Sequence, residues 1–314
     1  MKLIISSYAK ENKTIGLYEV NNLNVKLLDY DSIVNPSFVV KGDDCIYTYE
    51  KTDKLTLYSY KIIDSKFIVI DKFDIEGTGI THLVYSKVNS CLIGCSYPDG
   101  TFFSVEVKNN KFVKLNTYSK QINDERLSRC HCVFLNEDET EVGVVNIALD
   151  KIYFYNIKDG NLIYTDEVAT PLGSGPRHAL YNNNLIYTVT EYSNEVIVID
   201  RKSKSILQQI STVPNFKGTT YGATLVFSSD KKFLYATNRG EETIAKFEII
   251  NSKLVYINSF DCGGKHPRHM IITKDGKYII NCNKNSNNVS FFDTIKEEIV
   301  LSIDFSEPTG IIEL

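Results

Sequence analysis

The chain is a succession of short runs in which large apolar residues alternate with polar ones. Examples are CIYTYE (45–50), KIYFYNI (151–157), EVIVID (195–200) and NVSFFDT (288–294), with glycine, asparagine and aspartate between such runs. Tyr, Phe, Ile and Val dominate these runs, and they favour a pleated, half-buried strand. Long stretches with helical spacing are absent from the sequence. The pattern therefore predicts an all-β protein.

The runs repeat with a period in the forties. Six equivalent starting positions are separated by 44, 50, 46, 46 and 45 residues, and the tail EPTGIIEL begins a seventh unit 41 residues later. These positions are Pro36, Ile80, Cys130, Pro176, Gly222, Pro267 and Pro308. Several strands per unit at this period are typical of a β-propeller. We therefore expect a seven-bladed β-propeller with a central channel.

The last blade should be built from both ends of the chain. The tail supplies one strand, and KLIISSYAKENKTIGLYEV (2–20) contains two or three more. Joining these strands in one sheet removes the open edge that each end would otherwise expose. Such closure leaves no boundary between domains, so we expect a single domain over residues 1–314.

Composition and charge narrow the classes of partner. The 314 residues are 43% hydrophobic and 24% charged, with a net charge of −4. This acidic balance argues against a broad basic face for nucleic acid. The apolar run at the N-terminus is too short for a signal peptide or a membrane span. Seven scattered cysteines, an odd number, indicate reduced thiols rather than a disulfide framework. We therefore expect a cytoplasmic protein without a membrane partner.

The segment RCHC (129–132) is the one place that suggests a metal site. On a regular strand Cys130 and Cys132 would point to one side and His131 to the other. Three ligands arranged in this way do not converge on a tetrahedral zinc ion. We therefore expect no metal and no cofactor.

Cationic side chains gather at the starts of the repeats. The first three positions of the seven repeats are 21 of 314 residues, so fewer than one of the five histidines and six arginines should lie there by chance. Six do: His82, His131, Arg177, His178, Arg268 and His269. In a propeller these positions lie at the mouth of the channel. Such a concentration in an acidic chain indicates an anion site. Arg239 follows the second strand of its repeat, and Glu191 takes the matching place in the repeat before it.

The sequence Pro-Arg-His occurs twice, at residues 176–178 and 267–269. Duplicated blade packing would explain the repetition, but the other repeats carry different residues at these positions. A functional role is therefore favoured for Arg177 and Arg268, since a buried arginine needs an anionic partner. Glu191 and Arg239 either serve the site or pair only with each other. His82, His178 and His269 either bind substrate or are inner-strand histidines with internal partners.

These segments resemble a known family, the seven-bladed propeller lactonases, which include bacterial 6-phosphogluconolactonase of the propeller type and fungal carboxymuconate-lactonizing enzymes. The resemblance spans nearly the whole chain and rests on GSGPRHALY (173–181) with YTVTE (187–191), CHCVF (130–134), and PRHMIITKDGKYIINC (267–282). It implies that His131, Arg177, Glu191 and Arg239 are catalytic and that Arg268 is a further pocket cation.

The resemblance implies hydrolysis of a small anionic lactone, a phosphorylated or acidic sugar lactone, without a metal. That chemistry needs a base to deprotonate water, positive charge for the oxyanion and an anchor for the acidic group. His131 or Glu191 could be the base, and arginines could do the other two tasks. Two alternatives stay open, a muconate-type lactonizing cycloisomerase and a non-enzymatic propeller that binds a ligand or a protein. The oligomeric state is open as well.

Overall fold

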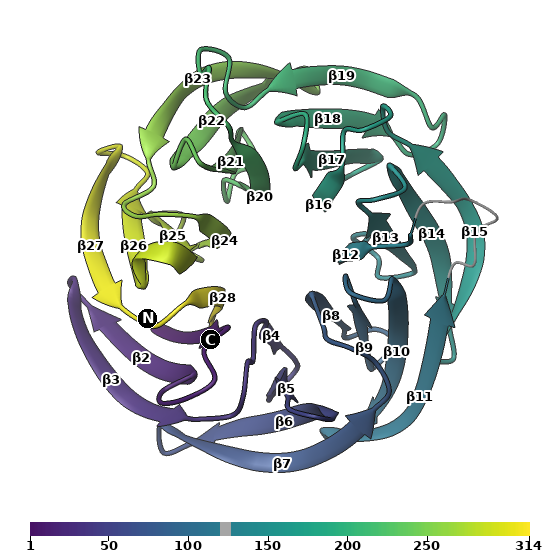
Figure 1. Ribbon diagram of the computed structural model, residues 1–314, viewed down its shortest axis with the longest axis vertical. Coiled ribbons are helices and arrows are strands. Elements are labelled where there is room, and N and C mark those ends of the chain that lie inside the picture. The colour runs from purple at the N-terminus through teal and green to yellow at the C-terminus, as the bar shows by residue number, and fades with distance from the viewer. Residues whose placement is uncertain (120–126) are drawn as a thin grey trace.

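Seven four-stranded antiparallel sheets stand in a ring in the computed structural model, which describes residues 1–119 and 127–314 (Figure 1). Each sheet is one blade, and its strands follow one another from the channel outwards. The prediction of an all-β, seven-bladed propeller is confirmed. Among the described residues, no helix is long and apolar enough to cross a membrane.

The strands fall into four concentric sets (Figure 1). The innermost strands are β28 (Pro308–Glu313), β4 (Val40–Lys41), β8 (His82–Ser86), β12 (Cys130–Leu135), β16 (Pro176–Asn182), β20 (Tyr221–Phe227) and β24 (Pro267–Ile272). The second strands are β1 (Lys2–Ser7), β5 (Ile46–Lys51), β9 (Cys91–Cys95), β13 (Glu141–Asn146), β17 (Leu185–Thr190), β21 (Phe233–Arg239) and β25 (Tyr278–Asn283). The third strands are β2 (Ile15–Asn21), β6 (Leu55–Ile63), β10 (Thr101–Lys108), β14 (Lys151–Lys158), β18 (Glu195–Asp200), β22 (Thr243–Ile250) and β26 (Asn288–Asp293). The outermost strands are β3 (Asn24–Asp31), β7 (Lys66–Ile75), β11 (Lys111–Ser119), β15 (Asn161–Ala169), β19 (Ile206–Ser211), β23 (Lys253–Asp261) and β27 (Glu298–Asp304). A short 3-10 turn, η1 (Lys284–Ser286), follows β25.

The ring closes through the two ends of the chain, as expected. β28 pairs with β1, with Ile311 opposite Ile5 and Glu313 opposite Leu3. The order of this blade is β28-β1-β2-β3. The C-terminal strand is therefore the innermost strand of a blade whose other three strands are N-terminal.

Four innermost strands, those from Cys130, Pro176, Pro267 and Pro308, begin at the predicted residues. The first blade differs most, because β4 begins at Val40 and not at Pro36. The Ser37 amide donates to the Asn35 carbonyl at 2.8 Å, and Asn35 has a φ of 56°, so a tight turn occupies the segment where the ladder begins in other blades.

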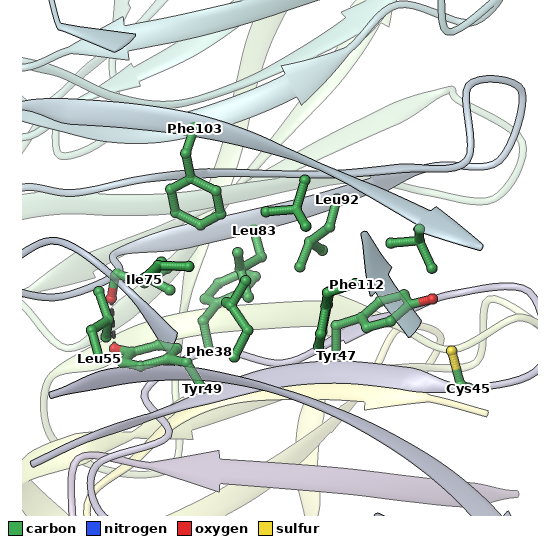
Figure 2. Close-up of a cluster of buried hydrophobic side chains, with 14 residues drawn as sticks. Phe38, Cys45, Tyr47, Tyr49, Leu55, Ile75, Leu83, Leu92, Phe103 and Phe112 are labelled. Carbon is green, nitrogen blue, oxygen red and sulfur yellow. Dashed lines mark hydrogen bonds between the residues drawn. The ribbon is translucent and has the colours of Figure 1, made fainter. Parts of the chain in front are cut away.

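The hydrophobic core lies between neighbouring blades. Adjacent residues of one strand face opposite neighbours: Tyr47 packs in a cluster with Leu83 of the next blade, and Ile46 packs with Ile4 of the preceding one. Figure 2 shows the first of these clusters, in which aromatic rings such as Phe103 fill the space between two sheets. Since both faces of each blade are covered in this way, polar side chains are free to gather at the channel and on the loops.

Candidate active site

A cavity of about 250 Å³ lies at the end of the channel where the innermost strands begin. His131, Glu191, Arg239 and Arg268 line it, as the sequence predicts. Its other lining residues are Tyr8, Asn35, Tyr49, Lys51, Thr78, Gly79, Ile80, Thr81, Tyr97 and Pro98. The structure thus brings residues from all seven blades to one small pocket.

A β-bulge places the functional side chain in three of the innermost strands. In β16, Pro176 pairs with Thr190 but His178 pairs with Val189, so Arg177 is an extra residue in the ladder. The same shift occurs at His131 in β12 and at Arg268 in β24. A bulge bends its strand and redirects a side chain, and bulges are frequent next to active sites. The blade repeat therefore carries a repeated device for presenting one side chain near the channel mouth.

The bulge at His131 corrects one sequence prediction. Cys130 packs in the cluster with Phe102 of the preceding blade, whereas Cys132 packs in the cluster with Ala179 of the following blade. The prediction that the two thiols point to one side is wrong, because the extra residue shifts the alternation by one position. In the part of the chain that the structure describes, no group of three His, Cys, Asp or Glu side chains is arranged to hold a metal ion.

The loop before β16 is held by a buried carboxylate. Asp150 accepts hydrogen bonds from the amides of Gly173 and Gly175, each at 2.9 Å. Both glycines have positive φ, 78° and 64°, which an L side chain rarely adopts. The Gly175 carbonyl in turn accepts from the Glu191 amide at 2.7 Å. One loop therefore fixes the start of the strand that carries Arg177 and the residue that pairs with it.

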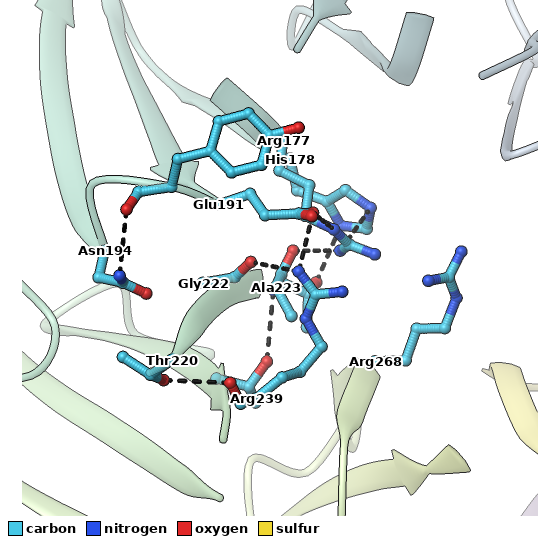
Figure 3. Close-up of polar contacts among 12 residues, drawn as sticks. Arg177, His178, Glu191, Asn194, Thr220, Gly222, Ala223, Arg239 and Arg268 are labelled. Atoms are coloured by element: carbon cyan, nitrogen blue, oxygen red, sulfur yellow. Dashed lines mark hydrogen bonds and ion pairs between the residues drawn. The ribbon is translucent and has the colours of Figure 1, made fainter. Parts of the chain in front are cut away.

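Glu191 contacts two arginines, Arg177 and Arg239, and Figure 3 shows both guanidinium groups close to its carboxylate. Its Oε2 accepts from Nε of Arg177 at 3.0 Å and lies 2.8 Å from Nη2 of Arg239. The Arg177 side chain is 1% exposed, that of Arg239 8% and that of Glu191 20%. Nη2 of Arg239 also donates to the Gly222 carbonyl at 3.0 Å. The arrangement is a largely buried triad with two positive charges and one negative charge.

These charges set the ionisation of Glu191. Burial would raise its pKa, but the charges of Arg177 and Arg239 outweigh burial and hold the pKa below the ordinary value of glutamate. Glu191 is therefore an anion at neutral pH. An anion stabilised in this way is a weak base, and its second oxygen, Oε1, accepts no hydrogen bond from the described side chains.

His131 faces the pocket as a neutral imidazole. Burial, followed by the charges of Arg177 and Arg268, lowers its pKa well below the ordinary value. Its Nδ1 is buried and has no hydrogen-bond partner within the described part of the chain. A neutral imidazole can accept a proton from water, and a bound anion would raise its pKa again.

Two further cations line the pocket. Arg268 donates from Nη2 to the Tyr8 hydroxyl, and its guanidinium lies 4.8 Å from the centre of that ring. Within residues 1–119 and 127–314, neither Arg268 nor Lys51 forms an ion pair with a carboxylate. Together with Arg239 and Glu191 they give the lining three cations and one carboxylate, a net charge of +2, and the buried Arg177 lies behind Glu191.

The other three predicted histidines lie deeper in the channel. His82, His178 and His269 line a second cavity of about 300 Å³ with mostly apolar walls. The rings of His82, His131 and His269 are 5.1, 5.4 and 6.4 Å from the ring of His178. The structure therefore brings the four rings together. Only His131 lines the cavity of about 250 Å³ at the channel mouth, which we call the upper pocket. Arg177 also lies below the pocket lining, in contact with Glu191.

Sequence reasoning missed Lys51 and Tyr8. Lys51 ends β5 and Tyr8 follows β1, so both stand at the end of a second strand. Arg239 and Glu191 were predicted from that same position in their own blades. The signal was therefore available, and it needed only to be applied to every blade.

Comparison with known proteins places the chain in a family context. The model of the family described as "Lactonase, 7-bladed beta-propeller" matches residues 2–304. The 6-phosphogluconolactonase of Bacillus subtilis (strain 168) is 24% identical over 283 residues, covering 84% of this chain and 81% of that protein. An uncharacterized protein of Staphylococcus aureus (strain N315) is 25% identical over 317 residues, with 93% and 92% covered.

Solved structures with the same fold include a protein from Lactobacillus plantarum, with a TM-score of 0.91, 19% identity and complete coverage of both chains. A periplasmic gluconolactonase of Pseudomonas aeruginosa has a TM-score of 0.89 and 20% identity, with 99% and 98% covered. At these identities the likeness supports the fold. The cytoplasmic location expected from the sequence stays a prediction.

Proposed function

This chain belongs to the family of seven-bladed β-propeller lactonases, and we propose that it hydrolyses a lactone carrying an acidic group, such as a phosphate. The observation that carries the proposal is the pocket itself. It combines a neutral imidazole, an ionised carboxylate and three cations, Lys51, Arg239 and Arg268, around a cavity of about 250 Å³. A B. subtilis relative named 6-phosphogluconolactonase supports the same class of substrate.

In the proposed reaction, water attacks the lactone carbonyl while His131 accepts its proton. We assign the base to His131 because its buried Nδ1 has no partner among the described residues, whereas the carboxylate of Glu191 is paired with two arginines. The free oxygen of Glu191 orients the attacking water. Arg239 faces the oxyanion of the tetrahedral intermediate, where fixed positive charge stabilises the transition state. The bond from the carbonyl carbon to the ring oxygen then breaks, and imidazolium returns the proton to that oxygen.

The acidic group of the substrate is held at the opposite wall by Arg268 and Lys51. Neither cation has a carboxylate partner among the described residues. No ion pair therefore has to break when the ligand binds. A dianionic phosphate with three acceptor oxygens matches two cations and the hydroxyl of Tyr8 better than a neutral sugar does. Anchoring and chemistry are thus assigned to different walls of one pocket.

The test is a panel of lactones with titration of the released acid at constant pH. The panel contains 6-phosphogluconolactone and neutral gluconolactone. It also contains carboxymuconate and the lactone that the lactonizing enzymes form from it. We expect the phosphorylated lactone to have the lowest KM. Activity on the muconate alone would assign the chain as a cycloisomerase. No acceleration on any compound would refute an enzymatic role.

Variants separate anchoring from chemistry. Arg268→Met or Lys51→Met should each raise KM for the phosphorylated lactone by about 30-fold, since loss of one partner of a desolvated charge pair costs about 2 kcal/mol or more. The neutral lactone should be hydrolysed as before. Lys54→Met is the matched control, because Lys54 lies three residues from Lys51 but is 69% exposed and pairs with Asp74. An equal effect on both lactones would contradict the assignment of the anchor.

A further inference from the structure

Arg177 is almost fully buried and its donors have specific partners. Nε donates to Glu191, and Nη1 donates to the Ala223 carbonyl in the next blade. The same Nη1 lies 3.4 Å from Nε2 of His178, the residue that follows in the chain. Figure 3 shows these contacts around one guanidinium. The imidazole is therefore part of the surroundings that fix the orientation of Arg177.

The contacts determine which nitrogen of His178 carries the proton. A guanidinium has donors only, so Nε2 of His178 must accept and cannot carry a hydrogen. In a neutral ring Nδ1 is then protonated, and it lies 3.1 Å from the hydroxyl oxygen of Thr224. Thr224 consequently accepts this hydrogen bond, and its oxygen stabilises the tautomer that Arg177 requires.

The surroundings also keep His178 neutral. The charged or titratable groups that face it are Arg177 and the rings of His82, His131 and His269, and none of these is an anion. Burial first, and then the charge of Arg177, lowers its pKa well below the ordinary value of histidine. A protonated ring would direct an N–H at the guanidinium. The acceptor lone pair is therefore present throughout the neutral range.

We propose that Thr224 and His178 are positioning residues that hold Arg177 in the geometry used for hydrolysis. Through Arg177 they also fix the position of Glu191 and the positive charge near His131. The catalytic role of that site rests on the proposed function. His178 does not line the upper pocket, so it acts through Arg177 rather than on the substrate. Thr224 lies in β20 where the ladder shifts between Gly222 and Leu225, and its amide donates to the Thr237 hydroxyl at 3.3 Å. Its position is thus set from the adjacent strand.

The test compares Thr224→Val with Thr224→Ser. Valine keeps the shape of the side chain but removes the acceptor, so Nδ1–H of His178 is left without a partner. The alternative tautomer would place a hydrogen against Arg177. We expect kcat/KM to fall at least tenfold in the valine variant and to return to within about threefold of the natural value in the serine variant, which keeps the hydroxyl.

The pH profile separates positioning from a merely structural role. Arg177 lowers the pKa of both Glu191 and His131. If the guanidinium moves away, both pKa values rise. The fall of kcat/KM at low pH should then occur at a higher pH, whether it reflects protonation of Glu191 or of His131. The matched control is Thr188→Val. The Thr188 hydroxyl is also buried and donates to the backbone carbonyl of His178 at 3.0 Å, but it does not touch the ring. Thr188→Val should lower stability and leave the pH profile in place.

A spectroscopic measurement decides the proposal independently of activity. Nitrogen-15 spectra of labelled histidine should show His178 neutral at pH 7 with the hydrogen on Nδ1, and Thr224→Val should abolish that state. The proposal is overturned if His178 carries the hydrogen on Nε2, if it is charged, or if Thr224→Val and Thr188→Val behave alike. If no lactone is hydrolysed but the tautomer responds as described, the proposed function fails while the Thr224–His178–Arg177 linkage stands.

Discussion

Replacement of Glu191 by glutamine removes the one carboxylate between two buried arginines. Glutamine has almost the same shape and can still accept through its amide oxygen, so the change tests charge rather than packing. Oε2 of Glu191 lies 3.0 Å from Nε of Arg177 and 2.8 Å from Nη2 of Arg239. After the change, two guanidinium groups with side chains 1% and 8% exposed share no counter-charge.

The expected loss of stability follows from the burial of the arginines. At a charge separation of about 4 Å and an effective dielectric constant of about 20, each attraction is about 4 kcal/mol. The desolvation cost of the arginines is already present in the folded protein, so removing their partner costs about 3–5 kcal/mol in measured cases. We expect the free energy of unfolding of Glu191→Gln to fall by that amount. At about 2 °C per kcal/mol for a chain of this size, Tm should fall by about 6–10 °C.

The effect should depend on pH in a defined direction. The pKa of Glu191 is lower in the folded state than the value of about 4.3 of an unfolded chain. Its stabilising contribution is therefore complete above pH about 4.3 and is lost as pH falls through the folded pKa. The difference in stability between the two proteins should be largest at neutral pH and shrink in acid.

Denaturant unfolding at pH 7 and at acidic pH measures both quantities. Glu298→Gln on the outermost strand β27 is the control for the same chemical change at an exposed position. Inorganic phosphate should restore part of the lost stability, by about 2.7 kcal/mol at 100 times its Kd, because it supplies the missing negative charge. Equal stability of Glu191→Gln and the natural protein at pH 7 would refute the reasoning.

Three further predictions follow from the same geometry. His131→Asn should lower kcat by about 10²–10⁴-fold in the lactone titration and leave phosphate binding within about threefold, since it removes the base and keeps the cations. Lys284→Glu should weaken phosphate binding, measured by calorimetry, at least tenfold, because it gives Arg268 the kind of partner that Glu191 gives Arg177. All seven thiols are buried, and burial raises the pKa of several of them, Cys282 included, so a thiol-specific disulfide reagent should label fewer than one in the folded protein and seven after unfolding.

The repeat made the fold predictable from the sequence. Each blade must cover both faces, so every unit needs the same apolar spacing, and the spacing revealed the number of blades and their starts. The exception in the first blade has a local cause, since a tight turn, in which the Ser37 amide donates to the Asn35 carbonyl, precedes β4. Local chemistry of this kind does not alter the hydrophobic period and leaves no trace in it.

The sequence pattern pointed to four of the residues that line the candidate pocket, but not to the depth at which each predicted side chain lies. The starts of the repeats pointed to His131 and Arg268, and the ends of the second strands pointed to Arg239. The pattern could not separate Arg268 from His178, because a bulge changes which side chain faces the pocket without changing the order of residues. His131 is itself the bulged residue of its strand and lines the upper pocket, whereas His178 and His269 follow a bulged arginine and line the deeper cavity.

The two Pro-Arg-His segments show how one repeated motif acquires two roles. In β16 and β24 the arginine is the bulged residue, and Pro176 and Pro267 pair with the last residues of β17 and β25. The next residue along the chain differs: it is Glu191 after β17 and Lys284 after β25. Arg177 therefore has a carboxylate in its own blade and is buried against it, whereas Arg268 has a second cation there and turns to the ring of Tyr8. The difference in charge at one strand end thus separates a buried ion pair from an open cation, and that open cation is available to an anionic ligand.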